Sequence, residues 1–418
     1  MSEHSRVDFM DPETLQCPFP FYASARAEAP VYRLPNSPVP GTDVYLVTRY
    51  DLIQSVLKDW RTFSNRFGGL MGRRDVNDPE LKEILAGGFA PVETMLTQDP
   101  PTQRIYRALA TKAFSLARIE KMDGYITQIC DELIDKFIDK GGCDFFQEFA
   151  IPLPVYVIAD QLGVPRSDID RFKRWSDDSI ASIGRMKGRE AVLRGARSQV
   201  EMQQYFAAAV EAARKSPGDD VISSLANAQF QGERLLTMSE ILSIIQQLLV
   251  AGNETTTNAL SGGMVYVLEE PGAQDRFAAE PSLIPNAVEE ILRLEAPTKA
   301  MWRVVTTDTE LGGVSIPAGA ALLLSYDAAN RDELKFSDGD HCVFNRENAA
   351  DHLSFGGGIH FCVGALLSRK EMTIAYQRLF SRLKNIRLAP DQEPLRYFES
   401  ILHRGYEHLK LSFDKRTA

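Results

Sequence analysis

The chain has 418 residues, of which 44% are hydrophobic and 25% are charged, as expected for a globular protein with a substantial core. Its formal net charge of −10 argues against nucleic acid or an anionic membrane as a partner of the whole surface. No run of about 18 apolar residues predicts a membrane span, and the first residues lack the apolar core of a signal peptide. Five scattered cysteines fit a reducing cytoplasm rather than a disulfide framework.

The first quarter of the chain is punctuated by proline and glycine. Residues 1–40 are predicted to be largely irregular. Residues 44–48 predict a strand, and residues 51–58 predict a short helix with Asp51 as its N-cap. Residues 66–96 are rich in glycine and charge, so we expect a long loop, which in a compact protein is more often functional than idle.

Helical patterns dominate the rest of the chain. Between residues 99 and 229, apolar residues recur at helical spacing. Thr237 and Glu240 form a capping-box pattern that opens a helix of more than thirty residues, roughly 45 Å long. Strand-like pieces follow a further helix at 284–294. The predicted fold class is therefore mainly α with a minor β part, and residues 1–418 are predicted to be a single domain, because neither a repeat nor a low-complexity linker divides them.

Residues 355–364 read FGGGIHFCVG, and the three glycines predict a bent backbone, since glycine reaches φ > 0 without steric cost. A helical pattern begins directly after Cys362, so its sulfur lies at or beside a helix N-terminus, which favours a thiolate. Such a thiolate is either a nucleophile or a metal ligand. A zinc site with His360 and the pair His341 and Cys342 lacks CxxC spacing, and a hydrolase with His360 as the base needs an awkward reach.

The long helix changes from apolar residues to the sequence AGNETTTN at 251–258. Glycine costs about 1 kcal/mol relative to alanine in a helix interior, and threonine is also a poor helix former. The hydroxyl of Thr255 can bond the carbonyl of Ala251 and bend the helix. The segment is either a solvated stripe or a pocket wall where Glu254 and Thr255 relay protons.

Two charged pairs share helix faces. Glu290 and Arg293 are three residues apart, a spacing that is common in surface ion pairs. Gln103 and Arg107 are four residues apart on a predicted helix that begins at Asp99, with prolines near its first turn. They form either a solvated face or an anion clamp, because arginine suits carboxylates.

Together these motifs resemble the cytochrome P450 family of haem-thiolate monooxygenases. Residues 355–364 fit its FGxGxHxCxG loop at each defined position, residues 290–293 fit its ExxR helix, and residues 251–256 fit its (A/G)Gx(D/E)T(T/S) motif. The order and spacing also agree, and the resemblance covers essentially the whole chain. It implies a P450 fold with a long central helix over the haem and the cysteine loop beneath it. The chain resembles the soluble, bacterial-type branch.

The resemblance implies that Cys362 is the axial thiolate on the iron of haem b (iron protoporphyrin IX), tuned by backbone N–H groups of its loop. Cationic donors at Arg107, Arg303 and His360 match positions that bind the haem propionates. Gln103 stands where many relatives carry histidine, so it brings a donor without charge. The cofactor-binding positions implied are Gln103, Arg107, Arg303, His360, Phe355, Gly356 and Gly364.

For catalysis, the resemblance implies that Glu254 and Thr255 deliver protons to O2, and that Glu290 and Arg293 brace the fold near the cysteine loop. Electrons from NAD(P)H would arrive through a ferredoxin-type or flavodoxin-type partner. Cations that could form a docking patch for it are Arg104, Lys112, Arg369 and Lys370. The expected enzyme is a cytoplasmic monomer that hydroxylates a mainly apolar small molecule such as a terpenoid, steroid, fatty acid or aromatic compound.

Substrate positions are implied more loosely. Most are apolar, so burial would drive binding at roughly 25 cal/mol per Å². Gln247 is the polar exception, and we hypothesise that it orients a substrate oxygen. The alternatives are a peroxide-driven peroxygenase, disfavoured by the intact Glu254 and Thr255, and a haem sensor without turnover. The substrate positions implied are Met95, Leu96, Gln247, Val250, Ala251, Thr298, Ala300, Met301, Ile401 and Leu402.

Overall fold

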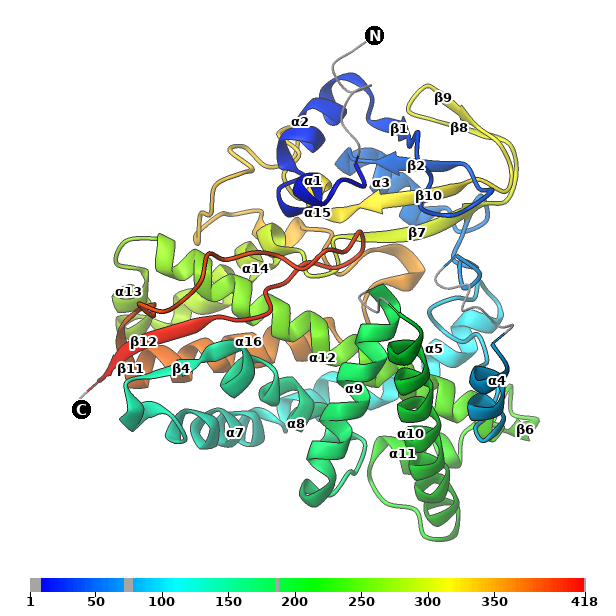
Figure 1. Ribbon diagram of the computed structural model, residues 1–418, viewed down its shortest axis with the longest axis horizontal. Coiled ribbons are helices and arrows are strands. Elements are labelled where there is room, and N and C mark those ends of the chain that lie inside the picture. Colours follow the sequence, from blue (N-terminus) through cyan, green and yellow to red (C-terminus); the bar gives the residue numbers. More distant parts are fainter. Residues whose placement is uncertain (1–8, 71–77, 185–187, 417–418) are drawn as a thin grey trace. The chain divides into compact units, whose positions relative to one another are not determined.

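The computed structural model describes residues 9–70, 78–184 and 188–416 (Figure 1). The chain forms two units. We call Met1–Asn65, Met122–Leu153 and Thr255–Ala418 the C-terminal unit, and Arg66–Lys121 and Pro154–Glu254 the helical unit. Helices dominate and sheets are small, which confirms the mainly α fold class with a minor β part. The single-domain assignment stays a prediction.

The C-terminal unit holds nearly all of the β structure. Two helices, α8 (Pro152–Gln161) and α12 (Met238–Glu269), begin in one unit and end in the other. The other helices and strands of the C-terminal unit are α1 (Pro12–Gln16), α2 (Phe19–Glu28), β1 (Val31–Arg33), β2 (Val44–Val47), α3 (Tyr50–Lys58), β3 (Phe63–Ser64), α7 (Asp123–Asp135), β4 (Gly142–Asp144), α13 (Ala273–Ala279), α14 (Ile284–Glu295), β7 (Ala300–Val305), β8 (Thr309–Leu311), β9 (Val314–Ile316), β10 (Ala321–Ser325), α15 (Tyr326–Ala329), α16 (Ala365–Arg382), β11 (Leu383–Leu388) and β12 (Lys410–Lys415).

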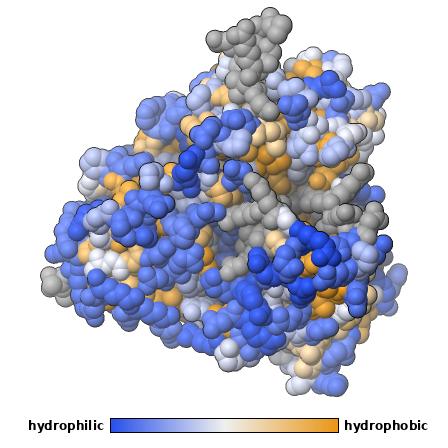
Figure 2. Space-filling model, in the orientation of Figure 1, coloured by the Kyte–Doolittle hydropathy of each residue, from blue (hydrophilic) through white to orange (hydrophobic). Residues whose placement is uncertain are grey.

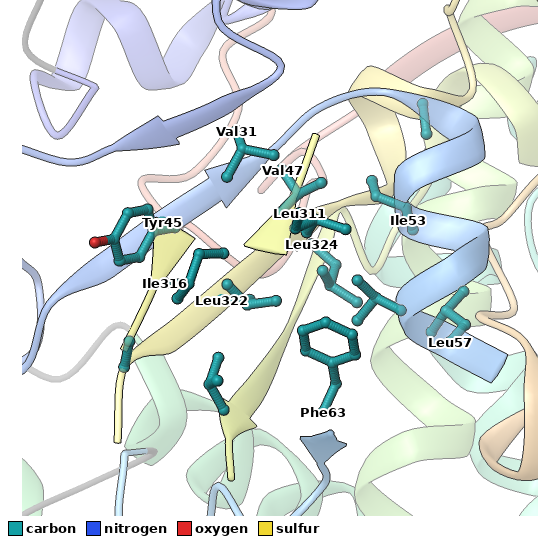
Figure 3. Packing of buried hydrophobic residues seen from close by; sticks show 14 of the residues in the cluster. Val31, Tyr45, Val47, Ile53, Leu57, Phe63, Leu311, Ile316, Leu322 and Leu324 are labelled. Carbon is teal, nitrogen blue, oxygen red and sulfur yellow. The ribbon is translucent and has the colours of Figure 1, made fainter. Parts of the chain in front are cut away.

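A five-stranded sheet in the order β1-β2-β10-β7-β3 forms one core of this unit. The pair β2 and β10 is parallel, and the other neighbours are antiparallel. All residues of β2 and β10 are buried, which explains their unbroken apolar runs. Figure 3 shows Ile53 and Leu57 of α3 packed beside Leu322, Leu324 and Phe63 from the sheet.

The prediction that residues 1–40 are largely irregular is wrong for the part that the structure describes, and residues 1–8 lie outside it. Helices α1 and α2 occupy this segment, and prolines stand in their first turns. Proline is tolerated there because the first N–H groups of a helix have no partner inside it. Pro12 and Pro20 therefore stand at helix starts, whereas Pro30, Pro35 and Pro38 lie outside the helices.

The prediction of Asp51 as an N-cap is also wrong. Helix α3 begins at Tyr50, with Arg49 as its N-cap residue. The N–H of Tyr50 donates instead to the Asp332 carboxylate at 2.8 Å, while Asp51 pairs with Arg49. The capping group comes from a distant segment, so local sequence could not reveal it.

The helical unit contains α4 (Pro79–Ala86), α5 (Thr102–Ala113), α6 (Leu116–Glu120), α9 (Ile169–Gly184), α10 (Arg189–Lys215), α11 (Val221–Ala226), β5 (Gln229–Phe230) and β6 (Arg234–Leu235). Helix α4 corrects the long loop predicted over residues 66–96, of which 71–77 lie outside the described residues. Asp78 caps α4 by accepting the N–H of Glu80 at 3.0 Å, and Leu81 packs on Leu193 of α10.

Helix α12 confirms the long helix predicted from its capping box. Thr237 donates its N–H to the Glu240 carboxylate at 2.7 Å, and Glu240 donates its N–H to the Thr237 hydroxyl at 3.3 Å. The helix then runs for 32 residues.

The face of the molecule drawn in Figure 2 is mainly polar. On the face drawn in Figure 2, hydrophobic residues appear in separate patches among hydrophilic ones. Of the helices within residues 9–70, 78–184 and 188–416, none has the length and apolar character needed to cross a membrane.

Candidate active site

The cysteine loop, residues 355–364, bends at its glycines as the sequence predicts. Gly356 and Gly358 have φ values of +65° and +62°, in the left-handed region that favours glycine. Gly358 also lies so close to the carbonyl of Leu57 that a Cβ atom would overlap it. The loop therefore requires glycine for both its conformation and its approach to α3.

Cys362 lies in this loop two residues before Gly364, the N-cap residue of α16. Its N–H donates to the Phe355 carbonyl at 2.9 Å, which closes the loop. The Cys362 side chain is exposed, so its sulfur faces outward from a bent and hydrogen-bonded backbone.

Glu289 on α14 fixes the residues around the loop. Its carboxylate accepts hydrogen bonds from Arg369 at 2.6 and 2.8 Å, and His352 Nε2 lies 3.2 Å away. The Arg369 guanidinium lies over the Phe355 ring, 4.6 Å from its centroid. Burial alone would raise the pKa of Glu289, but His352 and Arg369 lower it to about 2. Sequence reasoning missed this group because its partners lie 63 and 80 residues away.

The pair Glu290 and Arg293 is completely buried, so the surface ion-pair interpretation of this motif is wrong. Two hydrogen bonds of 2.7 and 2.8 Å join them, and Arg346 donates to Glu290 at 3.0 Å. Arg293 also donates to the carbonyls of Asn330 and Gly339, both at 2.6 Å. A buried carboxylate with two guanidiniums and backbone partners ties α14 to the segment that leads to the cysteine loop. Sequence reasoning missed Arg346.

Arg303 on β7 is buried beside the cysteine loop. Its guanidinium donates to the Trp302 carbonyl at 2.7 Å and also interacts with the hydroxyl of Tyr326. A Cβ at Gly356 would lie 3.5 Å from that hydroxyl. Burial raises the pKa of Tyr326, against the opposing effect of Arg303, so the phenol is neutral. The structure thus brings Arg303 close to the loop that carries Cys362 and His360.

The polar segment of α12 is largely buried, which corrects the solvated-stripe interpretation. Asn253, Thr256 and Thr257 are nearly inaccessible to solvent. Thr256 contacts the Ser368 hydroxyl at 3.2 Å, and Thr257 donates to the Ala150 carbonyl at 3.0 Å. Glu254 and Thr255 remain half-buried. The threonine run therefore holds α12 against its neighbours while the two predicted relay residues retain access.

Two predicted substrate segments lie side by side although about a hundred residues separate them. Thr298 pairs with His403 in an isolated antiparallel bridge, and the N–H of Lys299 donates to the Leu402 carbonyl at 2.9 Å. Ala300 and Leu402 are buried. Met301 and Ile401 are half-buried members of the same two segments.

In the helical unit, Gln103 and Arg107 share one face of α5, where Gln103 is buried and Arg107 half-buried. Their neighbour Tyr106 donates to the Glu240 carboxylate at 2.6 Å, and Arg234 donates to it twice at 2.8 Å. Burial would raise the pKa of Glu240, but these partners lower it to about 2. The capping residue of α12 therefore also anchors α5.

The remaining substrate positions also lie in the helical unit. Met95 is buried and Leu96 is exposed, next to one another after the α4 region. Gln247, Val250 and Ala251 are spaced at helical intervals along α12. The Oε1 atom of Gln247 is buried, and within the described part of the chain it accepts no hydrogen bond.

Comparison with known proteins identifies the chain. The Cytochrome P450 family model matches residues 190–408. The putative cytochrome P450 YjiB of Bacillus subtilis is 36% identical, with 87% of each chain covered. The chain belongs to the cytochrome P450 family.

Other P450 relatives have named activities. The 6-deoxyerythronolide B hydroxylase of Saccharopolyspora erythraea is 35% identical over 94% of this chain and 95% of its own. The steroid C26-monooxygenase of Mycobacterium tuberculosis is 35% identical, covering 78% and 89%. The structure of cytochrome P450 CYP109Q5 from Chondromyces apiculatus is 34% identical and covers 99% of both chains with a TM-score of 0.85.

This P450 is accordingly a haem-thiolate monooxygenase that acts on small molecules, and its predicted cofactors are confirmed: haem, O2 and NAD(P)H-derived electrons delivered by partner proteins. The described residues fit haem for two reasons. The exposed Cys362 follows the bent glycine loop, and the buried Arg303 lies close to that loop. Burial and the Glu290 carboxylate raise the pKa of the second cysteine, Cys342, to about 12.

The predicted docking cations differ in how freely they can meet a partner. Arg369 is bound by Glu289, and Lys370 pairs with Asp123 at 2.8 Å. Arg104 and Lys112 are exposed on α5. The docking patch stays a prediction, and two of its four charges are already engaged within the protein.

Proposed function

We propose that this P450 hydroxylates a steroid-like, mainly apolar molecule. The observation that carries the proposal is the pairing of Thr298–Met301 with the segment at Ile401 and Leu402, which brings the apolar residues Ala300, Met301, Ile401 and Leu402 into two neighbouring segments. Burial against such side chains stabilises an apolar ligand by roughly 25 cal/mol per Å². A steroid C26-monooxygenase and a vitamin D(3) 25-hydroxylase among the relatives support this substrate class.

The proposed haem site uses Cys362 as the thiolate ligand, and the backbone of the loop orients its sulfur. Arg303 and His360 of the C-terminal unit are the proposed donors to the propionate carboxylates, and the family resemblance alone assigns the same role to Gln103 and Arg107 of α5. Arginine suits carboxylates because its donors are planar and always charged. When bound, haem supplies the activation of O2 and accepts the electrons.

The proposed proton delivery uses Glu254 and Thr255. Glu254 exchanges protons with solvent, and the Thr255 hydroxyl passes them on, since a hydroxyl both donates and accepts a hydrogen bond. Gln247 is proposed to orient the substrate through its amide, because the buried Oε1 atom can accept a bond from a substrate hydroxyl. The enzyme is proposed to act as a cytoplasmic monomer with a ferredoxin-type or flavodoxin-type donor.

A titration of the ferric holoenzyme with a panel of steroids and fatty acids tests the substrate class. We expect saturable shifts of the Soret band with steroid-like compounds and formation of a hydroxylated product. Shifts with fatty acids alone, or none with any steroid, would overturn the substrate proposal.

A further inference from the structure

A strip of three polar residues and one glycine follows one side of α12 within the C-terminal unit. Asn258, Gly262 and Tyr266 are four residues apart, and Thr255 precedes Asn258 by three residues. These spacings place all four positions along one side of the helix, about one turn apart. The strip therefore leads from the proposed relay hydroxyl into the interior.

The carboxyl group of Glu295, the last residue of α14, lies against this strip at Gly262. A Cβ at Gly262 would overlap that carboxyl group, so the helix accepts it only because glycine stands there. Glu295 is fully buried, and within the described part of the chain neither of its oxygens has a hydrogen-bond partner. Arg404 Nε lies 3.6 Å from Oε2 of Glu295, which forms an ion pair but is longer than a hydrogen bond. Buried polar groups of this kind normally bind a ligand or water.

The side chain of Asn258, one helical turn before Gly262, is likewise buried beside a glycine. Its side chain is 1% exposed, and neither amide atom bonds to any described residue. A Cβ at Gly405 would overlap the amide, so a second glycine makes room for it. The Nε atoms of Arg404 and Arg331 are also buried, and neither has a hydrogen-bond partner among the described residues. Donors and acceptors alternate here, and water serves both kinds.

We propose that Glu295 and Asn258 bind internal water along α12, and that Glu295 supplies through this water the proton that restores the Thr255 hydroxyl during turnover. The carboxyl O–H bond of Glu295 breaks, the first of a chain of internal waters takes up that proton, the last water releases one, and the new O–H bond forms on Thr255. Glu295 is left as a carboxylate beside Arg404 until a solvent proton replaces the one it gave. Because Glu295 acts through Thr255, it is a positioning residue for the proton. The inference rests on the relay proposed for Thr255.

The surroundings of Glu295 suit proton exchange near neutral pH. Burial raises the pKa of Glu295 to about 7, while Arg404 and Arg331 oppose that rise. Four tyrosines also face it, and burial together with the Glu295 charge raises the pKa of each, so they stay neutral. These are Tyr266, Tyr376, Tyr397 and Tyr406.

A route back to solvent exists on the C-terminal segment. The hydroxyl of Tyr406 donates to that of Tyr397 at 2.6 Å, and Tyr397 is half-buried. Neutral phenols both donate and accept protons, so this pair can return a proton to Glu295.

The test compares the wild-type holoenzyme with Glu295→Gln, and with Glu269→Gln as a control at an exposed acid of α12. We expect Glu295→Gln to form at least about threefold less product per NADH and more peroxide between pH 6 and 8. Its haem content, its carbonyl spectrum and its turnover with added peroxide should match the wild type. An infrared titration should show a protonated carboxyl band that disappears near neutral pH and is missing in Glu295→Gln. Wild-type coupling in Glu295→Gln, or an unchanged carboxyl band, overturns the proposal.

Two further variants separate this inference from the proposed function. Thr255→Ala should lose coupling in the same assay. If it does and Glu295→Gln does not, only the present inference fails; if neither variant uncouples, the relay proposed for Thr255 fails as well. Should Glu295→Gln not fold, Asn258→Ala takes its place, and wild-type coupling in that variant overturns the proposal.

Discussion

Two buried acids on α14, five residues apart, have pKa values that are shifted in opposite directions. Glu290 and Glu295 are both 0% exposed. Burial alone would raise the pKa of Glu290, but Arg293, the Val343 N–H and Arg346 lower it. Burial raises the pKa of Glu295 to about 7, because its ion pair with Arg404, at 3.6 Å, opposes only part of that rise. The hydrogen-bond and ion-pair partners of a buried acid, rather than its burial, therefore decide whether it stabilises the fold or exchanges protons.

The largest expected effect on the free energy of unfolding is that of replacing Glu290. Glu290→Gln leaves Arg293 and Arg346 buried without a counter-charge, which costs about 3–5 kcal/mol of unfolding free energy. We expect little folded, haem-loaded protein, measured by urea unfolding and by haem content. A variant within about 1 kcal/mol of the wild type would show that the pairing does not brace the fold.

The effect at Glu295 depends on pH. Its carboxyl has a folded pKa of about 7, above the value near 4.5 in the unfolded chain, so stability is complete below pH 4.5 and falls as pH rises through 7. Between pH 5 and pH 8, the unfolding free energy of the wild type should therefore fall by roughly 1–3 kcal/mol relative to that of Glu295→Gln, which has no carboxyl to titrate at this position. Urea unfolding at the two pH values measures this. A constant difference would mean that the folded-state pKa of Glu295 is not raised.

Glu289 is an intermediate case, because it is paired but only partly buried. Glu289→Gln weakens two charge-assisted bonds and should cost about 1–2 kcal/mol. Since Arg369 lies over Phe355, the cysteine loop should also loosen. Spectra of the reduced carbonyl complex should show a smaller fraction with the red-shifted band of thiolate ligation. An unchanged fraction would show that Glu289 does not stabilise the cysteine loop.

The smallest effect on stability is expected at Gln247, which is polar but uncharged. Gln247→Leu removes a buried acceptor that lacks a partner among the described residues, so stability should change by less than about 1 kcal/mol. Affinity for a hydroxylated steroid should fall by about tenfold, while that for its deoxygenated analogue stays the same. Equal affinities of variant and wild type for both ligands would remove Gln247 from the substrate site.

The sequence could predict what depends on local pattern. The capping box of Thr237 and Glu240, the length of α12 and the bent glycine loop all follow from neighbouring residues, and the structure confirms them. It could not predict that Asp332 caps α3 or that Arg346 completes the bonding of Glu290. Those partners come from segments far along the chain, and only the folded structure brings them together.

The same limit explains the two errors in burial. Glu290 with Arg293, and the threonines after Thr255, read as surface patterns because the spacing of charges and hydroxyls carries no information on depth. The different states of Glu290 and Glu295 likewise depend on contacts that no short motif records.

The central claim, that Cys362 provides the thiolate of a haem enzyme, is tested most directly by one spectrum. The reduced carbonyl complex of the wild type should show the red-shifted Soret band of thiolate ligation, and Cys362→Ser should lack it while Cys342→Ser keeps it. The same red-shifted band in Cys362→Ser would contradict the account.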